Sequence, residues 1–229
     1  MPRYFEYGDE AVAYLKAKDS QLAAAIDAVG HVYREVDDDL FSAMVHHIVG
    51  QQVSTAAQRT IWARMQQAYG RVTPEAIGAA SEVELQAFGM TFRKAGYIKG
   101  FAAAVESGEL DLAAIEAMSD AEAIATLRAL PGIGTWTAEM LLLFCLQRPD
   151  VLSFDDLAIH RGMRMVYHHR KVTRAMFEKY RRRYSPYGSV ASLYLWAVSH
   201  MDVPGYSRDY APMTEAQKRA ARKKRRAKD

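Results

Sequence analysis

The sequence predicts an all-α protein. Apolar residues recur at helical spacing along most of the 229 residues, and no segment shows a convincing alternation of apolar and polar residues that would indicate a strand. Capping residues, glycines and prolines interrupt this pattern at short intervals. There is no repeat period, and the basic end of the chain is the only low-complexity segment. We therefore expect ten or more short helices.

The helix boundaries follow from local start and stop signals. Ser54 is a good N-cap for the helix that Gly70 ends, and Ser119 and Glu122 have the spacing of a capping box. A short segment, 150–154, precedes a helix that begins at about Asp156. The other expected helices span residues 10–18, 20–29, 39–52, 73–80, 81–89, 91–108, 111–118, 135–146, 173–184 and 188–201, and the capping box opens 119–130.

Charge is distributed unevenly. Residues 215–229 hold 8 of the 30 Lys and Arg residues and 2 of the 27 Asp and Glu residues, which leaves 22 bases and 25 acids elsewhere. Such a tail is either a solvated, mobile arm or a phosphate-binding segment, and the sequence favours neither. A second basic cluster lies between residues 170 and 183.

The single cysteine, Cys145, limits the chemistry of the chain. It excludes internal disulfides, four-cysteine zinc sites and iron–sulfur clusters held by four cysteines of this chain. No apolar run approaches the roughly 20 residues that span a bilayer, and the N-terminus has no apolar signal segment. We expect a monomer in the cytoplasm, associated with the nucleoid if the source is bacterial, with no membrane partner.

A tight turn stands out at "LPGIGTW", residues 130–136. Pro131 discourages continuation of the preceding helix, and Gly132 and Gly134 permit unusual backbone angles and close approach. The helix that begins near Thr135 offers unpaired N–H groups, which suit a phosphate. Taken alone, the motif favours a tight turn that only joins two core helices.

Two carboxylates follow in "DVLSFDDLAIHR", residues 150–161. Asp155 and Asp156 stand at the head of a helix whose Leu157 and Ile159 look apolar and inward-facing. Either aspartate could be an ordinary N-cap. An aspartate about 20 residues beyond a glycine-rich hairpin is nevertheless a specific arrangement.

Together these motifs resemble the helix–hairpin–helix DNA glycosylase superfamily, in particular its 3-methyladenine DNA glycosylase II (alkylpurine) branch. "FSAMVHHIVGQQVSTAAQ" (41–58), "FGMTFRKAGYIKGFA" (88–102) and "SPYGSVASLYLW" (185–196) match in order and spacing, so the resemblance covers roughly residues 30–200. Only about 40 residues precede the first of these motifs. We therefore expect the extra N-terminal mixed domain of some members to be missing.

The resemblance implies two helical subdomains with a DNA-binding cleft between them. Residues 40–148 would form a helical barrel domain that contains the helix–hairpin–helix at about 120–147. Residues 1–39 and 149–214 would form a second helical domain from both chain ends. Residues 215–229 would be a mobile basic tail.

The resemblance also implies an activity: hydrolysis of the N-glycosidic bond of alkylated purines such as 3-methyladenine and 7-methylguanine in duplex DNA. The base is flipped out first, and its release is the first step of base excision repair. Asp156 would be the catalytic carboxylate, and Asp155 would cap the helix or contact the backbone turn. Gln52 would be the wedge that fills the vacated space, the alternative being an ordinary polar residue of the loop. Gly132, Gly134 and Thr135 would bind a DNA phosphate. The lesion pocket would contain Trp136, Trp196, Met140 and Leu157.

Trp136 occupies the position where strand-cleaving members carry a lysine nucleophile, so we expect hydrolysis without AP lyase activity. No cofactor is expected, except that the carbonyls of Arg128, Leu130 and Ile133 could hold a structural Na⁺ or K⁺. His46 and His47 precede the wedge by one turn. One of them could face the cleft, although a histidine satisfied at the surface or in the core is the commoner case. Two alternatives remain: a non-catalytic helix–hairpin–helix DNA-binding module, and a bifunctional oxidised-base glycosylase/lyase.

Overall fold

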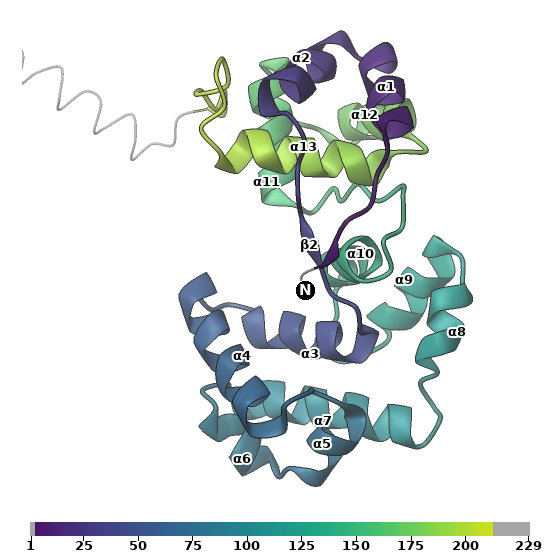
Figure 1. Cartoon of the computed structure of the whole chain (residues 1–229), viewed down its shortest axis with the longest axis vertical. Helices are drawn as coiled ribbons and strands as arrows, with labels where there is room; N and C mark the ends of the chain where they lie inside the picture. The colour runs from purple at the N-terminus through teal and green to yellow at the C-terminus, as the bar shows by residue number, and fades with distance from the viewer. Residues whose placement is uncertain (1–2, 213–229) are drawn as a thin grey trace, which may run out of the picture. The chain divides into compact units, whose positions relative to one another are not determined.

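The computed structural model describes residues 3–212, and Figure 1 labels its elements in chain order. The described chain is predominantly helical, as expected, and contains one two-stranded antiparallel pairing of β1 (Arg3–Tyr4) with β2 (Glu35–Val36). The basic segment 215–229 lies outside the described residues. The helices are α1 (Asp9–Lys18), α2 (Ser20–Val29), α3 (Leu40–Gly50), α4 (Thr55–Tyr69), α5 (Pro74–Ala79), α6 (Glu82–Ala87), α7 (Phe92–Glu106), α8 (Leu112–Ala117), α9 (Asp120–Arg128), α10 (Thr135–Phe144), α11 (Leu157–Tyr167), α12 (Arg174–Tyr184) and α13 (Gly188–His200).

The chain divides into two compact units. Among the described residues, unit 1 comprises 3–6 and Tyr33–Val151, and unit 2 comprises Tyr7–Val32 and 152–212. The expected boundary placed all of residues 1–39 with the C-terminal part. In the structure the β1–β2 pairing and the segment that leads into α3 belong to unit 1.

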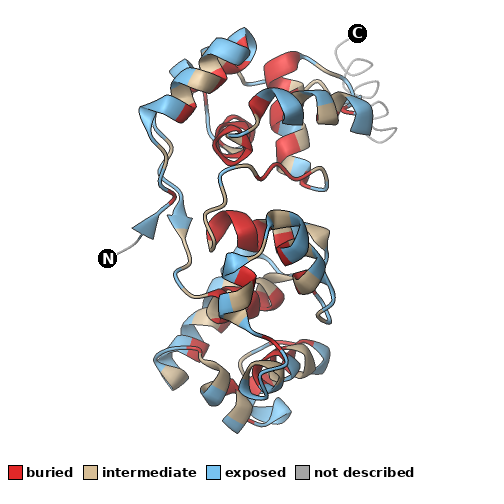
Figure 2. Cartoon of the chain, turned by 90° about the vertical axis from the view of Figure 1, so that its right-hand side faces the viewer, coloured by how far each residue is buried: buried red, intermediate tan, exposed pale blue. Residues whose placement is uncertain are grey.

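Unit 1 is organised around α3 and α7. Helix α3 packs against α4, α7 and α10, and α7 also packs against α5 and α6. Met44, Ile48 and Ile98 are among the fully buried side chains of this core. Figure 2 shows the result within the unit, where helices carry one buried face and one exposed face. This amphipathic packing supplies most of the stability of short helices that would not form alone.

Unit 2 is built on α13, most of whose residues are buried. It packs against α2, α11 and α12. A buried polar network joins the N-terminal and C-terminal segments of this unit. The Asp19 carboxylate accepts hydrogen bonds from the Tyr167 hydroxyl at 3.1 Å and from the Arg183 guanidinium at 2.5 Å, and Tyr167 also hydrogen-bonds to Tyr184. Burial raises the pKa of Tyr167 and of Tyr184, so both hydroxyl groups stay protonated.

The local signals place most helix ends correctly. Ser54 caps α4, Gly70 ends it, and the Ser119–Glu122 capping box opens α9. Several helices end earlier than expected, among them α3, which stops at Gly50 rather than at Gln52, and α9, which stops at Arg128 rather than at Leu130. At Gln52 the reason is visible, because its φ of +55° lies outside the right-handed helical region.

No helix within the described residues is both long enough and apolar enough to cross a membrane.

Candidate functional site

The turn at residues 129–134 joins α9 to α10 as a tight hairpin. Gly132 has a φ of +84°, and a side chain there would place its Cβ 2.5 Å from the Tyr97 ring. Only glycine fits both constraints. Gly134 is different, since its φ of −91° is open to any residue and nothing lies within 4 Å of where a Cβ would be. Of the two glycines expected to permit unusual backbone angles, only Gly132 adopts one.

The start of α10 is open. Gly134 is its N-cap residue, and no side chain caps the first turn, which begins at Thr135. The first N–H groups of a helix and the positive end of its dipole attract anions. The empty space around Gly134 gives such an anion room to approach the backbone. This geometry fits the phosphate-binding role expected for Gly132, Gly134 and Thr135, which stays a prediction.

The hairpin also contains the carbonyls expected to hold a monovalent cation. The Leu130 carbonyl accepts one backbone hydrogen bond, from Ile133 N–H at 3.2 Å, and a carbonyl oxygen has two lone pairs. The bonds that end α9 go to the carbonyls of Ala125, Thr126 and Leu127, one turn before Arg128 and Leu130. Carbonyl oxygens of this kind are suitable ligands for Na⁺ or K⁺. Binding of such an ion to the hairpin stays a prediction.

Trp136 lies in the first turn of α10, and 40% of its surface is exposed. Its ring meets the ring of His47 from α3 edge-on, with the centroids 6.3 Å apart. Burial lowers the pKa of His47 to about 4, so this imidazole is neutral at physiological pH. A neutral neighbour leaves the aromatic face suited to a cationic ring. Met140, also expected in the lesion pocket, is only 2% exposed and lies in the core of unit 1.

Gln52 lies in the loop between α3 and α4, which we call the wedge loop (residues 51–54). It is exposed and has a left-handed backbone conformation. The neighbouring Gln51 ties this loop to the hairpin, because its Nε2 donates to the Gly132 carbonyl at 2.8 Å. The structure thus brings together, within unit 1, the expected wedge and the expected phosphate-binding hairpin.

In unit 2, Asp156 is the N-cap of α11. Its Oδ1 accepts hydrogen bonds from the backbone N–H groups of Ala158 at 2.8 Å and Ile159 at 2.9 Å. The indole Nε1 of Trp196 donates to the same oxygen at 3.0 Å. The side chain is 6% exposed. The expectation that Asp155 caps this helix is wrong: Asp156 caps it, and Asp155 is exposed.

Two residues expected in the lesion pocket, Trp196 and Leu157, differ in their environment. Trp196 is half-buried on α13 and holds Asp156 through its N–H group. Leu157, the first residue of α11, is 84% exposed, so the expectation that it faces inward is wrong, whereas Ile159 is fully buried.

The segment that leads to Asp156 is held by aromatic packing. The Phe154 ring packs edge-on against Phe177 and His160, and the Arg174 guanidinium lies 3.9 Å from the centroid of the Phe154 ring. Ser153 is fully buried. These contacts fix the backbone immediately before Asp156.

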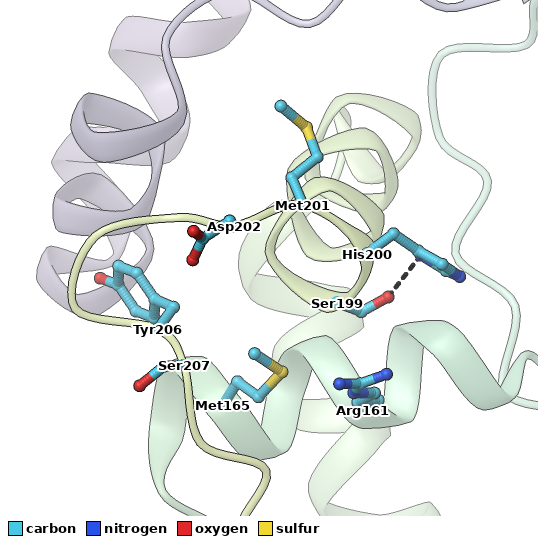
Figure 3. A pocket seen from close by; sticks show the side chains of 8 residues that line it. All are labelled: Arg161, Met165, Ser199, His200, Met201, Asp202, Tyr206 and Ser207. Carbon is cyan, nitrogen blue, oxygen red and sulfur yellow. Dashed lines mark hydrogen bonds between the residues drawn. The ribbon is translucent and has the colours of Figure 1, made fainter.

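A cavity of about 370 Å³ lies between α11, the end of α13 and the segment that follows α13 (Figure 3). Arg161 from α11 and His200 from the end of α13 line it, and the His200 Nδ1 is 2.7 Å from the Ser199 hydroxyl. Asp202 also lines this cavity, and its negative charge offsets the positive charge of Arg161. The cavity therefore favours neither an anion nor a cation. Among the described residues no group of three or more His, Cys, Asp or Glu side chains could hold a metal ion.

The expected site residues therefore fall into two sets, each described within its own unit. Unit 1 contains the hairpin, the wedge loop, Trp136 and Met140, and unit 2 contains Asp156, Trp196 and Leu157. The supporting residues Lys94 and Tyr97, which underlie the wedge loop and the hairpin, were not anticipated. The signal available for them was a lysine and a tyrosine one turn apart within the otherwise apolar face of α7.

The model of one protein family matches residues 45–186, which is more than half of the chain and includes the hairpin and Asp156. That family is described as the HhH-GPD superfamily of base excision DNA repair proteins. The chain belongs to this superfamily.

Relatives and solved structures agree with this assignment to the HhH-GPD superfamily. The crystal structure of a DNA-3-methyladenine glycosidase from Bacillus halodurans is 34% identical, with a TM-score of 0.78 over 87% of this chain and 93% of that chain. A 3-methyladenine DNA glycosylase (Mag1) from Schizosaccharomyces pombe, in complex with abasic DNA, is 28% identical, with a TM-score of 0.76 over 87% of this chain and all of that chain. DNA-3-methyladenine glycosylase 2 of Escherichia coli is 33% identical over 69% of this chain, and the match covers 57% of the length of the E. coli protein.

Proposed function

We propose that the protein is a monofunctional DNA glycosylase that hydrolyses the N-glycosidic bond of alkylated purines in duplex DNA. The observation that carries the proposal is the buried Asp156 carboxylate, one oxygen of which accepts three N–H hydrogen bonds. A phosphate-binding module needs no such group. The superfamily assignment and the 3-methyladenine glycosylases among its similar proteins supply the substrate class.

The reaction breaks the bond between C1′ of the deoxyribose and the purine nitrogen. An alkylated purine such as 3-methyladenine or 7-methylguanine carries a positive charge, so it leaves with the bonding electrons as a neutral base. Positive charge then develops on the sugar, which becomes oxocarbenium-like. Water adds to C1′ and loses a proton, and the product is an abasic site.

Asp156 has two tasks in this scheme. Its negative charge stabilises the cationic sugar, and it orients the attacking water and accepts its proton. The hydrogen bonds to Ala158, Ile159 and Trp196 hold the carboxylate in one orientation, so little reorganisation is needed as the charge develops.

Unit 1 supplies the DNA-binding elements. We assign a backbone phosphate to the open start of α10 at Gly134 and Thr135, and the space left by the extruded base to Gln52. Trp136 offers an exposed aromatic face, and such faces attract cationic rings by stacking and cation–π forces. The neutral His47 beside it adds no repulsive charge.

Trp136 also bears on the fate of the abasic site once the base has left. A lyase needs an amine that attacks C1′ and forms a Schiff base, and an indole has no such amine. We therefore expect the abasic product to remain intact.

The experiment uses a duplex oligonucleotide with one 7-methylguanine and the full chain in excess. Release of free 7-methylguanine is measured by chromatography, and strand breaks are measured with and without alkali. Base release with breaks only after alkali is the expected result. Breaks without alkali would indicate the oxidised-base lyase. Binding without base release would indicate a non-catalytic DNA-binding module.

A further inference from the structure

The wedge loop is held in a strained conformation. Gln52 has a φ of +55°, in the left-handed region that is unfavourable for a residue with a side chain, so other contacts must maintain it. The Gln58 side chain lies where a side chain on Gly50 would be, and its Nε2 donates to the His46 carbonyl at 3.2 Å. These contacts hold the entrance to the loop, but they leave Gln51 and Gln52 to be supported from elsewhere.

That support comes from a buried lysine on α7. The Lys94 ammonium donates to the Val49 carbonyl at 2.9 Å and to the Gln51 carbonyl at 2.5 Å. Both carbonyls lie at the C-terminus of α3, where the helix leaves acceptors without partners and where its dipole favours a cation. Lys94 therefore bonds directly to the first residue of the wedge loop.

The burial of this charge is unusual. Lys94 is only 9% exposed, and none of the described carboxylates forms an ion pair with it. Burial lowers its pKa. Placing a cation in the interior without an anionic partner is costly, whereas methionine would fill a similar volume without that cost. In the structure, the hydrogen bonds from the Lys94 ammonium to the Val49 and Gln51 carbonyls offset this cost.

The same helix also supports the hairpin. Tyr97 lies one turn beyond Lys94, and its ring packs under Gly132, in the space a side chain there would need. Gln51, held by Lys94 through its carbonyl, donates through its amide to the Gly132 carbonyl. The result is a continuous chain of hydrogen bonds from Lys94 through Gln51 to the hairpin.

We propose that Lys94 is a positioning residue for the DNA wedge, which fixes the wedge loop to the hairpin so that Gln52 is in place when a paired base is extruded. This rests on the proposed glycosylase function and adds a residue that touches neither the base nor the sugar. A rigid wedge loop matters most when the target base is stacked and paired, because extrusion then costs the most.

Lys99 provides a matched control. It lies on the same helix, and its ammonium likewise donates to two carbonyls at a helix end, Gly78 at 2.9 Å and Ala80, at the C-terminus of α5. That end is separate from the wedge loop. Lys94→Met and Lys99→Met therefore remove the same kind of interaction, and only the first removes it from the wedge loop.

The test measures single-turnover release of 7-methylguanine from two duplexes, one with the lesion paired to cytosine and one with it in a single-nucleotide bulge. Lys94→Met should slow release from the paired duplex about 10-fold or more and change release from the bulge less than about 3-fold, since a small displacement of a positioned group is costly. Lys99→Met should leave both rates close to wild type.

Gln51→Leu keeps the proposal testable if Lys94→Met fails to fold. It removes the amide that reaches Gly132, and it should show the same selective loss on the paired duplex. Combined with Lys94→Met it should add less than the product of the two single effects, because both act through one connection. The proposal would be overturned if Lys94→Met and Gln51→Leu slowed release from the paired and the bulged duplex equally. It would also be overturned if Lys99→Met slowed release from the paired duplex as much as Lys94→Met does. Absence of release by the wild-type chain would contradict the proposed function itself.

Discussion

Helices α10 and α11 begin in similar ways and are used in opposite ways. Each has an N-cap residue with an extended backbone, Gly134 with a φ of −91° and Asp156 with a φ of −84°. At α10 no side chain caps the first turn, so the positive end of the dipole is open to an anion from outside. At α11 the chain supplies the anion itself, and a tryptophan holds it in place. The difference is one side chain, and it separates the proposed phosphate site from a fixed negative charge.

The largest effect should follow from removing the charge at α11. Asp156→Asn keeps an oxygen that can cap the helix, so the fold should be retained. Loss of the charge that faces the oxocarbenium-like sugar should reduce excision by about 10²–10³-fold, comparable to removal of one preorganised electrostatic group in other enzymes. DNA binding should change little. Single-turnover base release and a filter-binding titration measure the two quantities.

The neighbouring Asp155→Asn is the control, because this carboxylate is exposed and does not cap the helix. Its excision rate should stay within about twofold of wild type, as expected for a surface substitution. Equal losses for both aspartates would remove the special role of Asp156.

The second prediction closes the open end of α10. Gly134→Asp should favour the helix, since an acidic N-cap suits the dipole, yet it should weaken DNA binding about 10-fold by repelling a phosphate. Gly134→Asn fills the same space without charge and should weaken binding less. Thermal melting and DNA affinity at two salt concentrations distinguish the effects.

Gly8 offers a control for this change. It is the N-cap of α1, with a φ of −99°, no side-chain cap, and nothing within 4 Å of the Cβ position. Gly8→Asp should leave DNA affinity unchanged. If Gly8→Asp and Gly134→Asp weaken binding equally, the effect is one of net charge, and α10 is not a phosphate site.

The third prediction concerns the aromatic face at the start of α10. Trp136→Leu keeps an apolar side chain but removes the π-system, which should slow excision of cationic 7-methylguanine about 10-fold and of neutral hypoxanthine less, because cation–π attraction is lost only for the former. Trp62 lies in the same unit and packs against His46, with ring centroids 4.6 Å apart. Trp62→Leu should not discriminate between the two bases, and competition between the lesions in one reaction measures the ratio.

The smallest expected effect is a pH dependence of the free energy of unfolding, caused by His47, whose ring contacts Trp136. The pKa of His47 falls from 6.5 in the unfolded chain to about 4 in the folded protein. Between these values the unfolded chain binds more protons, so the free energy of unfolding falls as the pH drops below about 6.5. The loss at pH 5 should be on the order of 1–2 kcal/mol. Urea unfolding at pH 7.5 and 5 measures it, and His47→Gln should abolish most of it; an unchanged difference would place its origin elsewhere.

Local rules account for most of what could be predicted. The N-cap at Ser54, the capping box at Ser119 and the stop at Gly70 each act within one helical turn, and the structure confirms all three. The same rules did not decide between Asp155 and Asp156, because either residue can begin a helix. The choice rests partly on the Trp196 indole, which is 40 residues away in the chain.

The side chains that support the site could not be found in this way. Nothing near Lys94 in the sequence shows that its ammonium lies at the end of α3, more than 40 residues earlier. Leu157 shows the converse error: an apolar residue at the start of a helix looks inward, but the first turn of α11 leaves it exposed. Apolar periodicity reports an average face, and it is least informative at helix ends.

The sequence by itself determined the helical class, the positions of most helix caps and the glycine-rich hairpin. It also determined the residue types available for a site: one carboxylate pair, glutamines and tryptophans. These depend on interactions that span a single turn. The tertiary structure alone decided which aspartate is held by an indole, why Gly132 must be glycine, and how a buried lysine meets the wedge loop. Each of these depends on packing between segments far apart in the chain, where long-range burial sets both the geometry and the charge state.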